Sequence, residues 1–226
     1  MFESRYSKVL TVILVIVIIA ILVLIGFLGY DYYKKNQIAK EAAEYVDNYK
    51  GGTSEEQTET QNNTGATNLN DIASTPASDS STTSTSKAKK GNYKGYETVG
   101  TMKIPAINFE YPILDSQGAQ AIELAVAVSF PYGENINQPG NTVIIGHNYR
   151  NGVLFSNNKK LKVGDKIYVT DYRGTSLVYT IYNKFETNDD DTSFYQRETN
   201  GKAELTLSTC TDASNKRRLI ILAKQD

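Results

Sequence analysis

The apolar and polar positions divide the chain into three zones, and the first is an uninterrupted apolar run. Residues 9–28 carry no charged side chain, and only Thr11 and Gly26 break the run. A helix rises 1.5 Å per residue, so twenty residues span about 30 Å, the thickness of a bilayer's hydrocarbon core. A cleaved signal peptide would have an apolar core of roughly 7–15 residues before a small-residue cleavage site. We therefore expect residues 9–28 to be an uncleaved transmembrane anchor.

The charges beside this run leave its orientation almost undecided. Basic residues flank both sides nearly equally, so the positive-inside rule does not choose between them. The N-terminal flank is short, and large C-terminal domains cross membranes largely regardless of charge. We expect residues 1–8 in the cytoplasm and the rest outside, on a single-pass protein of the plasma membrane.

The second zone is polar and has two parts. Residues 29–50 are rich in helix formers, which predicts a helix that continues out of the bilayer until Gly51 and Gly52. Residues 51–90 are rich in serine and threonine and poor in large aliphatic side chains. Such a segment buries too little apolar surface to offset its ordering entropy, so we expect a disordered linker. It is interpreted either as a tether or as a spacer without a partner.

The third zone, residues 91–226, has the pattern of a β-rich globular domain. Short β-branched and aromatic runs alternate with clusters of Gly, Asn and Asp, which predicts strands separated by turns. The predicted strands are residues 98–104, 141–145, 166–170, 176–182, 204–209 and 218–223. Residues 120–128 have the only helical pattern in this zone. Many short strands at this spacing favour a closed barrel or a sandwich.

Charge and composition narrow the function classes. The formal net charge is −1, from 24 Lys and Arg against 25 Asp and Glu, which argues against a nucleic-acid-binding surface. The chain has one cysteine, Cys210, and one histidine, His147. A single cysteine excludes an intramolecular disulfide, and the pair excludes a zinc site of the finger or ribbon type.

Both of these residues follow predicted strands. His147 lies in Gly-His-Asn directly after the run at 141–145, although a hydrogen-bonded loop histidine would fit the same pattern. Cys210 ends the run at 204–209, where Thr206 and Ser208 share its face and the leucines point to the other. A small buried cysteine is the alternative, but a thiol among hydroxyl groups at a strand end is better placed to react than to pack.

Two arginines open the last apolar run. Arg217 and Arg218 follow Cys210 by seven and eight residues, a spacing that fits a hairpin returning to the cysteine. Solvated charges at a strand edge would explain them equally well when taken alone. Together with Cys210 and His147, they offer a nucleophile, a proton donor and a cation, the three groups that acyl transfer needs.

These motifs resemble those of the sortases, the cysteine transpeptidases of Gram-positive cell surfaces. The resemblance covers residues 97–224 and rests on Gly-His-Asn at 146–148, Thr-Leu-Ser-Thr-Cys-Thr at 206–211 and Arg-Leu-Ile-Ile at 218–221. It is closest to class B. It implies a mainly β fold, a closed eight-stranded barrel with a few short helices, preceded here by the transmembrane helix and the disordered stalk.

The resemblance also assigns roles to residues of this sequence. Cys210 would be the nucleophile, His147 the acid and base, and Arg218 the catalytic arginine, with Arg217 the alternative on the opposite strand face. Ser208, Thr209 and Asn148 would bind substrate. No cofactor and no metal are implied. The three aspartates at 189–191 could form a calcium site as in some relatives, but they are interpreted as a solvated turn.

The implied reaction joins surface proteins to the cell wall. The enzyme would cleave an LPxTG-like or NPxTN-like C-terminal sorting signal after threonine, form a thioester, and transfer the protein to an amine of a peptidoglycan precursor or cross-bridge. Three alternatives stay open: a class D-like sortase, a pilus-related sortase, and a tethered β-barrel binding module without catalysis. A papain-like hydrolase is disfavoured, because there the cysteine precedes the histidine and opens a helix.

Overall fold

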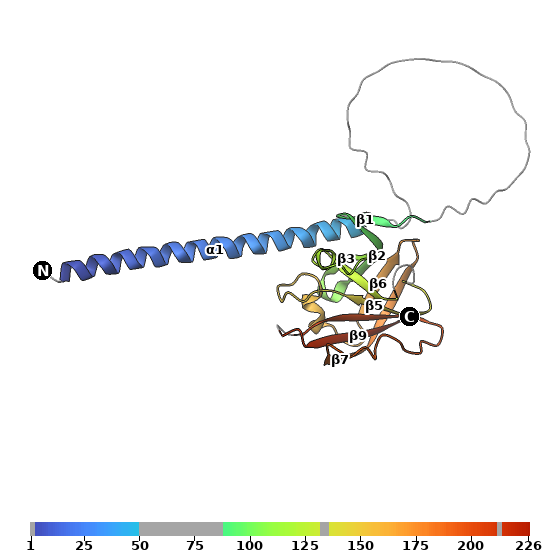
Figure 1. Cartoon of the computed structure of the whole chain (residues 1–226). Coiled ribbons are helices and arrows are strands. Elements are labelled where there is room, and N and C mark those ends of the chain that lie inside the picture. Colours follow the sequence, from blue (N-terminus) through green and yellow to red (C-terminus); the bar gives the residue numbers. More distant parts are fainter. Residues whose placement is uncertain (1–2, 50–87, 132–135, 212–213) are drawn as a thin grey trace, which may run out of the picture.

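The computed structural model describes residues 3–49, 88–131, 136–211 and 214–226, and it combines one long helix with one β-barrel (Figure 1). Helix α1 (Glu3–Asn48) covers the first segment predicted to be helical, 9–28, and residues 29–48 of the second, 29–50; Tyr49 has no regular secondary structure, and Lys50 lies outside the described residues. It is long and apolar enough to cross a membrane once, and its apolar stretch contacts no other described part of the chain. The predicted disordered linker lies mostly outside the described residues; its last three residues, 88–90, have no regular secondary structure.

The remaining elements form a closed barrel with three short helical turns. The strands are β1 (Gly91–Tyr93), β2 (Tyr96–Ile104), β3 (Phe109–Leu114), β4 (Val126–Phe130), β5 (Gly140–Ile145), β6 (Lys166–Asp171), β7 (Ser176–Asn188), β8 (Ala203–Cys210) and β9 (Arg217–Gln225). The helical turns are η1 (Pro105–Ile107), α2 (Ala119–Ile122) and η2 (Phe155–Lys160).

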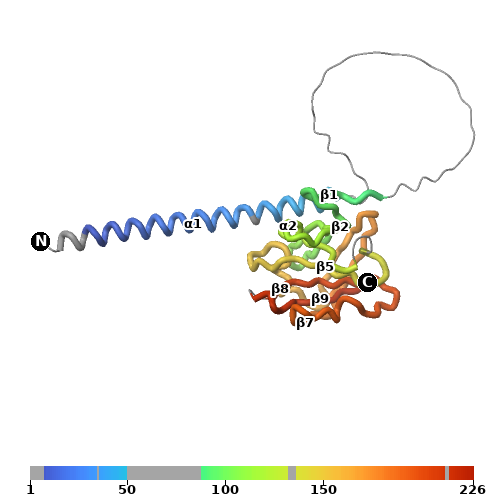
Figure 2. The backbone as a smooth tube through the Cα atoms, in the orientation of Figure 1, coloured from blue at the N-terminus to red at the C-terminus, as the bar shows by residue number. Residues whose placement is uncertain are grey.

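The order of the strands shows how the barrel closes. They lie in the order β1-β2-β3-β4-β5-β8-β9-β7-β6, and β6 also pairs with β2. Eight strands therefore form the ring, while β1 extends β2 as a hairpin outside it. Figure 2 shows β5, β8, β9 and β7 side by side on one wall. The predicted eight-stranded barrel is confirmed, and all six predicted strands are present.

The helix predicted over residues 120–128 is wrong for most of its length. Only Ala119–Ile122 forms a helical turn, and Val126–Phe130 is strand β4. This strand pairs with β3 on one side and β5 on the other, and Val126–Val128 is buried. A short apolar run fits a buried strand as well as a helix, and here the two neighbouring strands select the strand. Strands β1 and β3 were not predicted.

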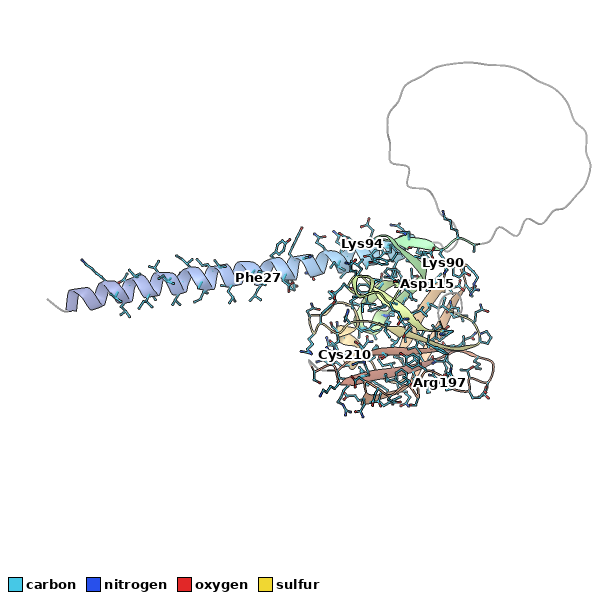
Figure 3. All side chains as sticks on the ribbon, viewed as in Figure 1. Phe27, Lys90, Lys94, Asp115, Arg197 and Cys210 are labelled. Carbon is cyan, nitrogen blue, oxygen red and sulfur yellow. The ribbon has the colours of Figure 1, made fainter. Side chains whose placement is uncertain are left out.

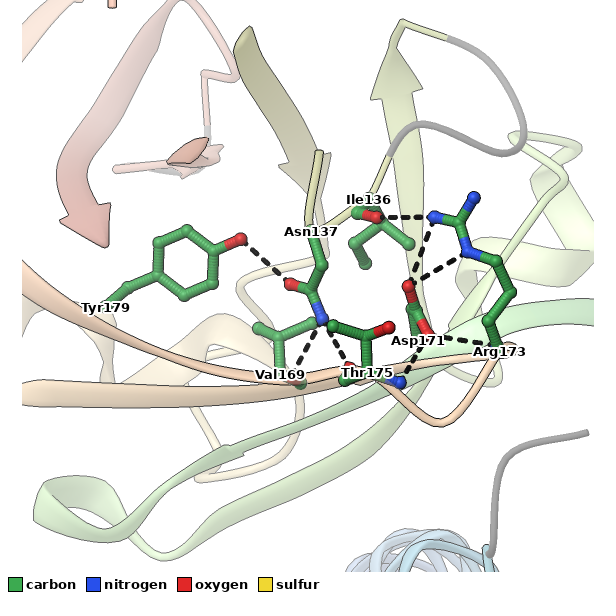
Figure 4. A network of polar contacts seen from close by, with 7 residues as sticks. All are labelled: Ile136, Asn137, Val169, Asp171, Arg173, Thr175 and Tyr179. Carbon is green, nitrogen blue, oxygen red and sulfur yellow. Dashed lines mark hydrogen bonds and ion pairs between the residues drawn. The ribbon is translucent and has the colours of Figure 1, made fainter. Parts of the chain in front are cut away.

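A buried polar network ties the β6–β7 turn to the barrel (Figure 4). Asp171 is fully buried and accepts hydrogen bonds from the backbone N–H groups of Arg173 and Thr175, while its second oxygen pairs with the Arg173 guanidinium. Asn137 donates to the carbonyls of Val169 and Thr175. A buried carboxylate is tolerated only when it is paired and hydrogen-bonded, as Asp171 is.

Candidate active site

The parallel pairing of β5 and β8 brings the histidine and the cysteine to the same edge of the barrel. Ile145, the last residue of β5, pairs with Ser208, two residues before the end of β8. His147 follows two residues after β5, and Cys210 is the final residue of β8. The carboxyl ends of parallel neighbours meet at one sheet edge, so residues that are distant in sequence converge there.

The antiparallel pairing of β8 and β9 places an arginine beside the cysteine. Cys210 pairs directly with Arg218, and Arg218 Nη1 lies 3.3 Å from Cys210 Sγ. The same nitrogen donates to the carbonyl of Asn215 at 2.6 Å, which holds the guanidinium at the cysteine. Arg217 points elsewhere and contacts Glu186 at 3.4 Å on the surface. Of the two candidate arginines, Arg218 is therefore the one at the thiol.

Five of the six residues predicted for the site line one cavity of about 340 Å³. This volume is within the range of small-molecule and cofactor pockets. Its lining includes His147, Ser208, Thr209, Cys210 and Arg218. The sixth, Asn148, donates through its side-chain amide to the carbonyl of Cys210 at 2.8 Å.

Two hydrogen bonds tie the histidine segment to the cysteine strand. Asn148 provides one of them, and the Thr209 hydroxyl donates the other to the carbonyl of Gly146 at 2.7 Å. Both bonds flank His147 in sequence. They hold the backbone on either side of the histidine at a constant distance from the end of β8, which limits the relative motion of His147 and Cys210.

An acidic residue lies next to the histidine. Glu123, directly after α2, places Oε1 3.7 Å from His147 Nε2, and its carboxylate accepts a hydrogen bond from the Tyr149 hydroxyl. The rings of His147 and Tyr149 lie 5.0 Å apart. Burial, and then the Glu123 carboxylate, raise the pKa of Tyr149 well above its usual range, so its hydroxyl stays a donor. Sequence reasoning missed Glu123 because it assigned this residue to a helix.

The segment between β7 and β8 forms another wall of the cavity. Phe194 and Tyr195 line it, and the Asn141 side-chain amide donates to the carbonyls of both residues at 3.0 and 2.9 Å. Arg197 donates to the Phe194 carbonyl at 3.1 Å and pairs with Glu204 at 2.7 Å. Asn141 belongs to β5 and Glu204 to β8, so two strands hold this segment in place, and only the tertiary structure brings them to it.

Comparison with known proteins identifies the family. A family model described as the sortase domain matches residues 102–226, which is more than half of the chain. The chain belongs to the sortase family. Sortase A of Bacillus anthracis is 30% identical over 134 residues, which cover 56% of this chain and 59% of that protein. This sortase therefore spans less than two thirds of the length of that curated relative.

Solved sortases share the fold. The sortase D5 transpeptidase of Clostridium perfringens is 27% identical, with a TM-score of 0.51 over 57% of this chain and 79% of that chain. Sortase A of Corynebacterium diphtheriae is 25% identical, with a TM-score of 0.53 over 62% of this chain and 63% of that chain. The family membership fits the barrel and the convergence of Cys210, His147 and Arg218 at its edge.

Two of the three aspartates of this sortase at 189–191, Asp189 and Asp191, line the cavity. Asp191 accepts hydrogen bonds from the backbone N–H of Ser193 and the hydroxyl of Thr187, and hydrogen bonds from these two residues lower its pKa. Across the described ranges, no group of three or more His, Cys, Asp or Glu side chains is arranged to hold a metal ion. The Asp191 carboxylate instead closes the turn after β7.

Proposed function

We propose that this sortase is a membrane-anchored cysteine transpeptidase and endopeptidase. Its substrates would be surface proteins with a C-terminal sorting signal, LPxTG-like or NPxTN-like, cleaved after threonine. The acceptor would be an amine of a peptidoglycan precursor or cross-bridge. The observation that carries the proposal is the position of Arg218 Nη1, 3.3 Å from Cys210 Sγ, in the cavity that also contains His147.

The proposed chemistry assigns one task to each of three side chains. The Cys210 thiolate attacks the carbonyl carbon of the substrate threonine, and the Arg218 guanidinium donates to the oxyanion that forms. When the tetrahedral intermediate collapses, the C–N bond breaks and His147 donates its proton to the leaving amine. A thioester to Cys210 remains. The acceptor amine then attacks this thioester, loses a proton to His147, and releases the thiolate.

We propose that Ser208, Thr209 and Asn148 contribute to substrate binding in different ways. Ser208 lines the cavity and is 6% exposed. The polar groups of Thr209 and Asn148 are already engaged with Gly146 and Cys210. We therefore propose that Thr209 and Asn148 shape the groove by positioning its backbone, while Ser208 contacts the peptide directly.

The segment between β7 and β8 is the basis on which we propose a sortase class for this chain. The resemblance of the motifs favours class B, in which a helix covers the groove between these strands. In this chain, residues 189–202 are all described and contain no helix. This favours a class D-like enzyme over class B, and the likeness to the Clostridium perfringens sortase D5 transpeptidase supports it. Cleavage rates measured on both LPxTG-like and NPxTN-like peptides would show which signal the enzyme prefers, and this preference would separate the two classes.

We propose a single-pass topology for the whole chain. Residues 9–28 of α1 would cross the plasma membrane, residues 1–8 would lie in the cytoplasm, and the barrel, beginning at residue 91, would lie outside. The uninterrupted apolar surface of α1 supports the anchor, and the short N-terminal flank supports the orientation.

The test is cleavage of fluorogenic sorting-signal peptides by the full chain in detergent or vesicles. We expect cleavage of at least one signal type, trapping of the thioester by hydroxylamine, and loss of both with Cys210→Ala or His147→Ala. Arg217→Ala is the matched control and should retain activity. If peptides bind to the wild-type chain and are not cleaved, the binding-module alternative is correct instead.

A further inference from the structure

The C-terminal turns of α1 pack against the barrel, although about forty residues of linker separate the two in sequence. The residues that face the barrel are spaced three and four apart, as one helix face requires: Ala39, Ala42, Tyr45, Val46 and Tyr49. Ala42 is fully buried and Val46 is 4% exposed, whereas the apolar residues of the 9–28 segment are about half exposed or more. This end of α1 is therefore an interface.

Aromatic and hydroxyl groups form the centre of this interface. The Tyr45 ring meets the Tyr93 ring of β1 edge-on at 5.1 Å, and the Tyr45 hydroxyl shares a hydrogen bond with Thr98 of β2 at 2.9 Å. The missing side chain of Gly91 makes this approach possible, because a Cβ there would lie 2.7 Å from the Thr98 hydroxyl and 3.3 Å from the Tyr49 ring.

Two ion pairs flank the apolar contact. Glu41 pairs with Lys94 of the β1–β2 turn, and Asp47 pairs with Lys103 of β2 at 2.7 Å. Figure 3 shows Lys94 close to the last turns of α1. Each pair is partly exposed, so each contributes little to stability, but together they define which face of the helix meets the barrel and in which direction.

Small residues bring the helix close to the base of β3. Ala39 and Ala43 line a second cavity together with Pro105, Phe109 and Leu154. Leu154 belongs to the segment that starts at His147, and its backbone N–H donates to Tyr111 of β3. The helix therefore packs beside β3, the strand that also contacts the histidine segment.

We propose that residues 39–48 of α1, together with Tyr49 directly after it, are a docking element that holds the barrel on the membrane anchor. The docking element, and not the linker, would then position the barrel. The first docking residue, Ala39, follows the apolar segment by eleven residues, which is roughly 16 Å of helix. The barrel would therefore be held at a set height and orientation above the bilayer. A disordered tether would allow the barrel a wide range of both. The docking itself is independent of the proposed reaction.

The experiment uses the two ion pairs as reporters in the full chain in vesicles. A site for a specific protease is inserted between Asn63 and Thr64, and a carbodiimide joins carboxylates to amines that are in direct contact. We expect the helix and the barrel to migrate as one species after protease cleavage, with peptides joined at Glu41–Lys94 and Asp47–Lys103 by mass spectrometry. The double variant Lys94→Gln/Lys103→Gln should separate into two fragments.

A matched pair of substitutions shows whether the interface itself is responsible. Ala42→Arg places a charge in the buried face and should lower the joined fraction at least fivefold. Glu44→Arg, two residues away on the exposed face, should leave it unchanged. The proposal is overturned if the wild-type chain separates into two fragments, or if Ala42→Arg and Glu44→Arg give the same joined fraction. Neither result depends on whether the peptides above are cleaved.

Discussion

Glu123 Oε1 lies 3.7 Å from His147 Nε2, and the same carboxylate accepts a hydrogen bond from the Tyr149 hydroxyl. Glu123 directly follows α2, a single helical turn between β3 and β4. A short helical turn on one strand connection therefore orients the histidine that follows a different strand. The Glu123 side chain is 60% exposed and that of His147 is 33% exposed, so solvent screens their attraction.

Glu123→Gln should therefore slow the enzyme without stopping it. An exposed ion pair contributes about 0.2–1 kcal/mol, which corresponds to a loss in kcat of roughly 1.4- to fivefold. KM should not change, because Glu123 acts through His147 and not on the peptide. Steady-state kinetics measures both constants. Tyr149→Phe, which removes the hydrogen bond to Glu123, should lower kcat in the same direction; an unchanged kcat in both variants would show that the carboxylate has no positioning role.

Arg218→Ala and Arg217→Ala should differ sharply. Removing an oxyanion donor costs about 10²–10³-fold in kcat, and this loss is expected for Arg218→Ala. The Arg217 side chain pairs with Glu186 on the surface, so Arg217→Ala should stay within about twofold of the wild type. Arg218→Lys keeps the charge but loses the planar fork and should recover only part of the rate. Equal losses at 217 and 218 would contradict the assignment.

Gly146→Ala should disturb both stability and activity. A Cβ at Gly146 would lie 2.8 Å from Phe155 Cδ2 and 2.8 Å from Val126 Cγ1, and both neighbours are fully buried. Overpacking of this kind costs about 1–3 kcal/mol of unfolding free energy, and the displaced backbone carries His147. Gly118→Ala is the control, because the nearest atom there is 3.5 Å away. Urea denaturation measures the unfolding free energy of the two variants, and a peptide-cleavage assay measures their activity.

Arg197→Met should destabilise the barrel strongly. Arg197 and Glu204 are 18% and 12% exposed and pair at 2.7 Å, so the substitution removes the cation from the largely buried Glu204, which keeps a hydrogen bond from the Tyr182 hydroxyl. Loss of one member of such a pair costs about 3–5 kcal/mol. Arg217→Met removes a half-exposed pair and should cost less than about 0.5 kcal/mol. Chemical denaturation of both variants tests the difference, and similar midpoints would argue against a structural role for Arg197.

The docking interface should weaken in alkali. Burial at α1, and then the nearby Glu41 carboxylate, raise the pKa of Tyr93 to about 12. A free tyrosine ionises near pH 10. Docking is therefore fully stabilised below about pH 10 and loses this contribution as the pH rises through about 12. Tyrosinate absorbs at ~295 nm. The difference between the titration curves of the wild type and Tyr93→Phe at this wavelength therefore reports the ionisation of Tyr93. In the Ala42→Arg variant, its titration should move toward pH 10.

Local patterns were sufficient to predict most strands of the barrel and to single out Cys210 and His147 as candidate catalytic residues, while Arg217 and Arg218 both stayed candidates. The predicted strands formed because β-branched and aromatic runs between turn residues suit a pleated, half-buried surface. The alternation around Cys210 placed it with Ser208 on one strand face, and both line the cavity. The strand at residues 126–130 could not be predicted in the same way, because a buried apolar run lacks a period that distinguishes strand from helix.

The sequence by itself determined the apolar helix, the β-rich domain and the identity of the unique cysteine and histidine, since each depends on composition or on neighbours within a few positions. Only the tertiary structure decided that Arg218 and not Arg217 contacts Cys210, that Glu123 lies beside His147, and that Ala42 is buried against the barrel. Each of these depends on strand register or on surfaces brought together from distant segments. Such contacts are fixed by the packing of the whole barrel, and no local pattern encodes them.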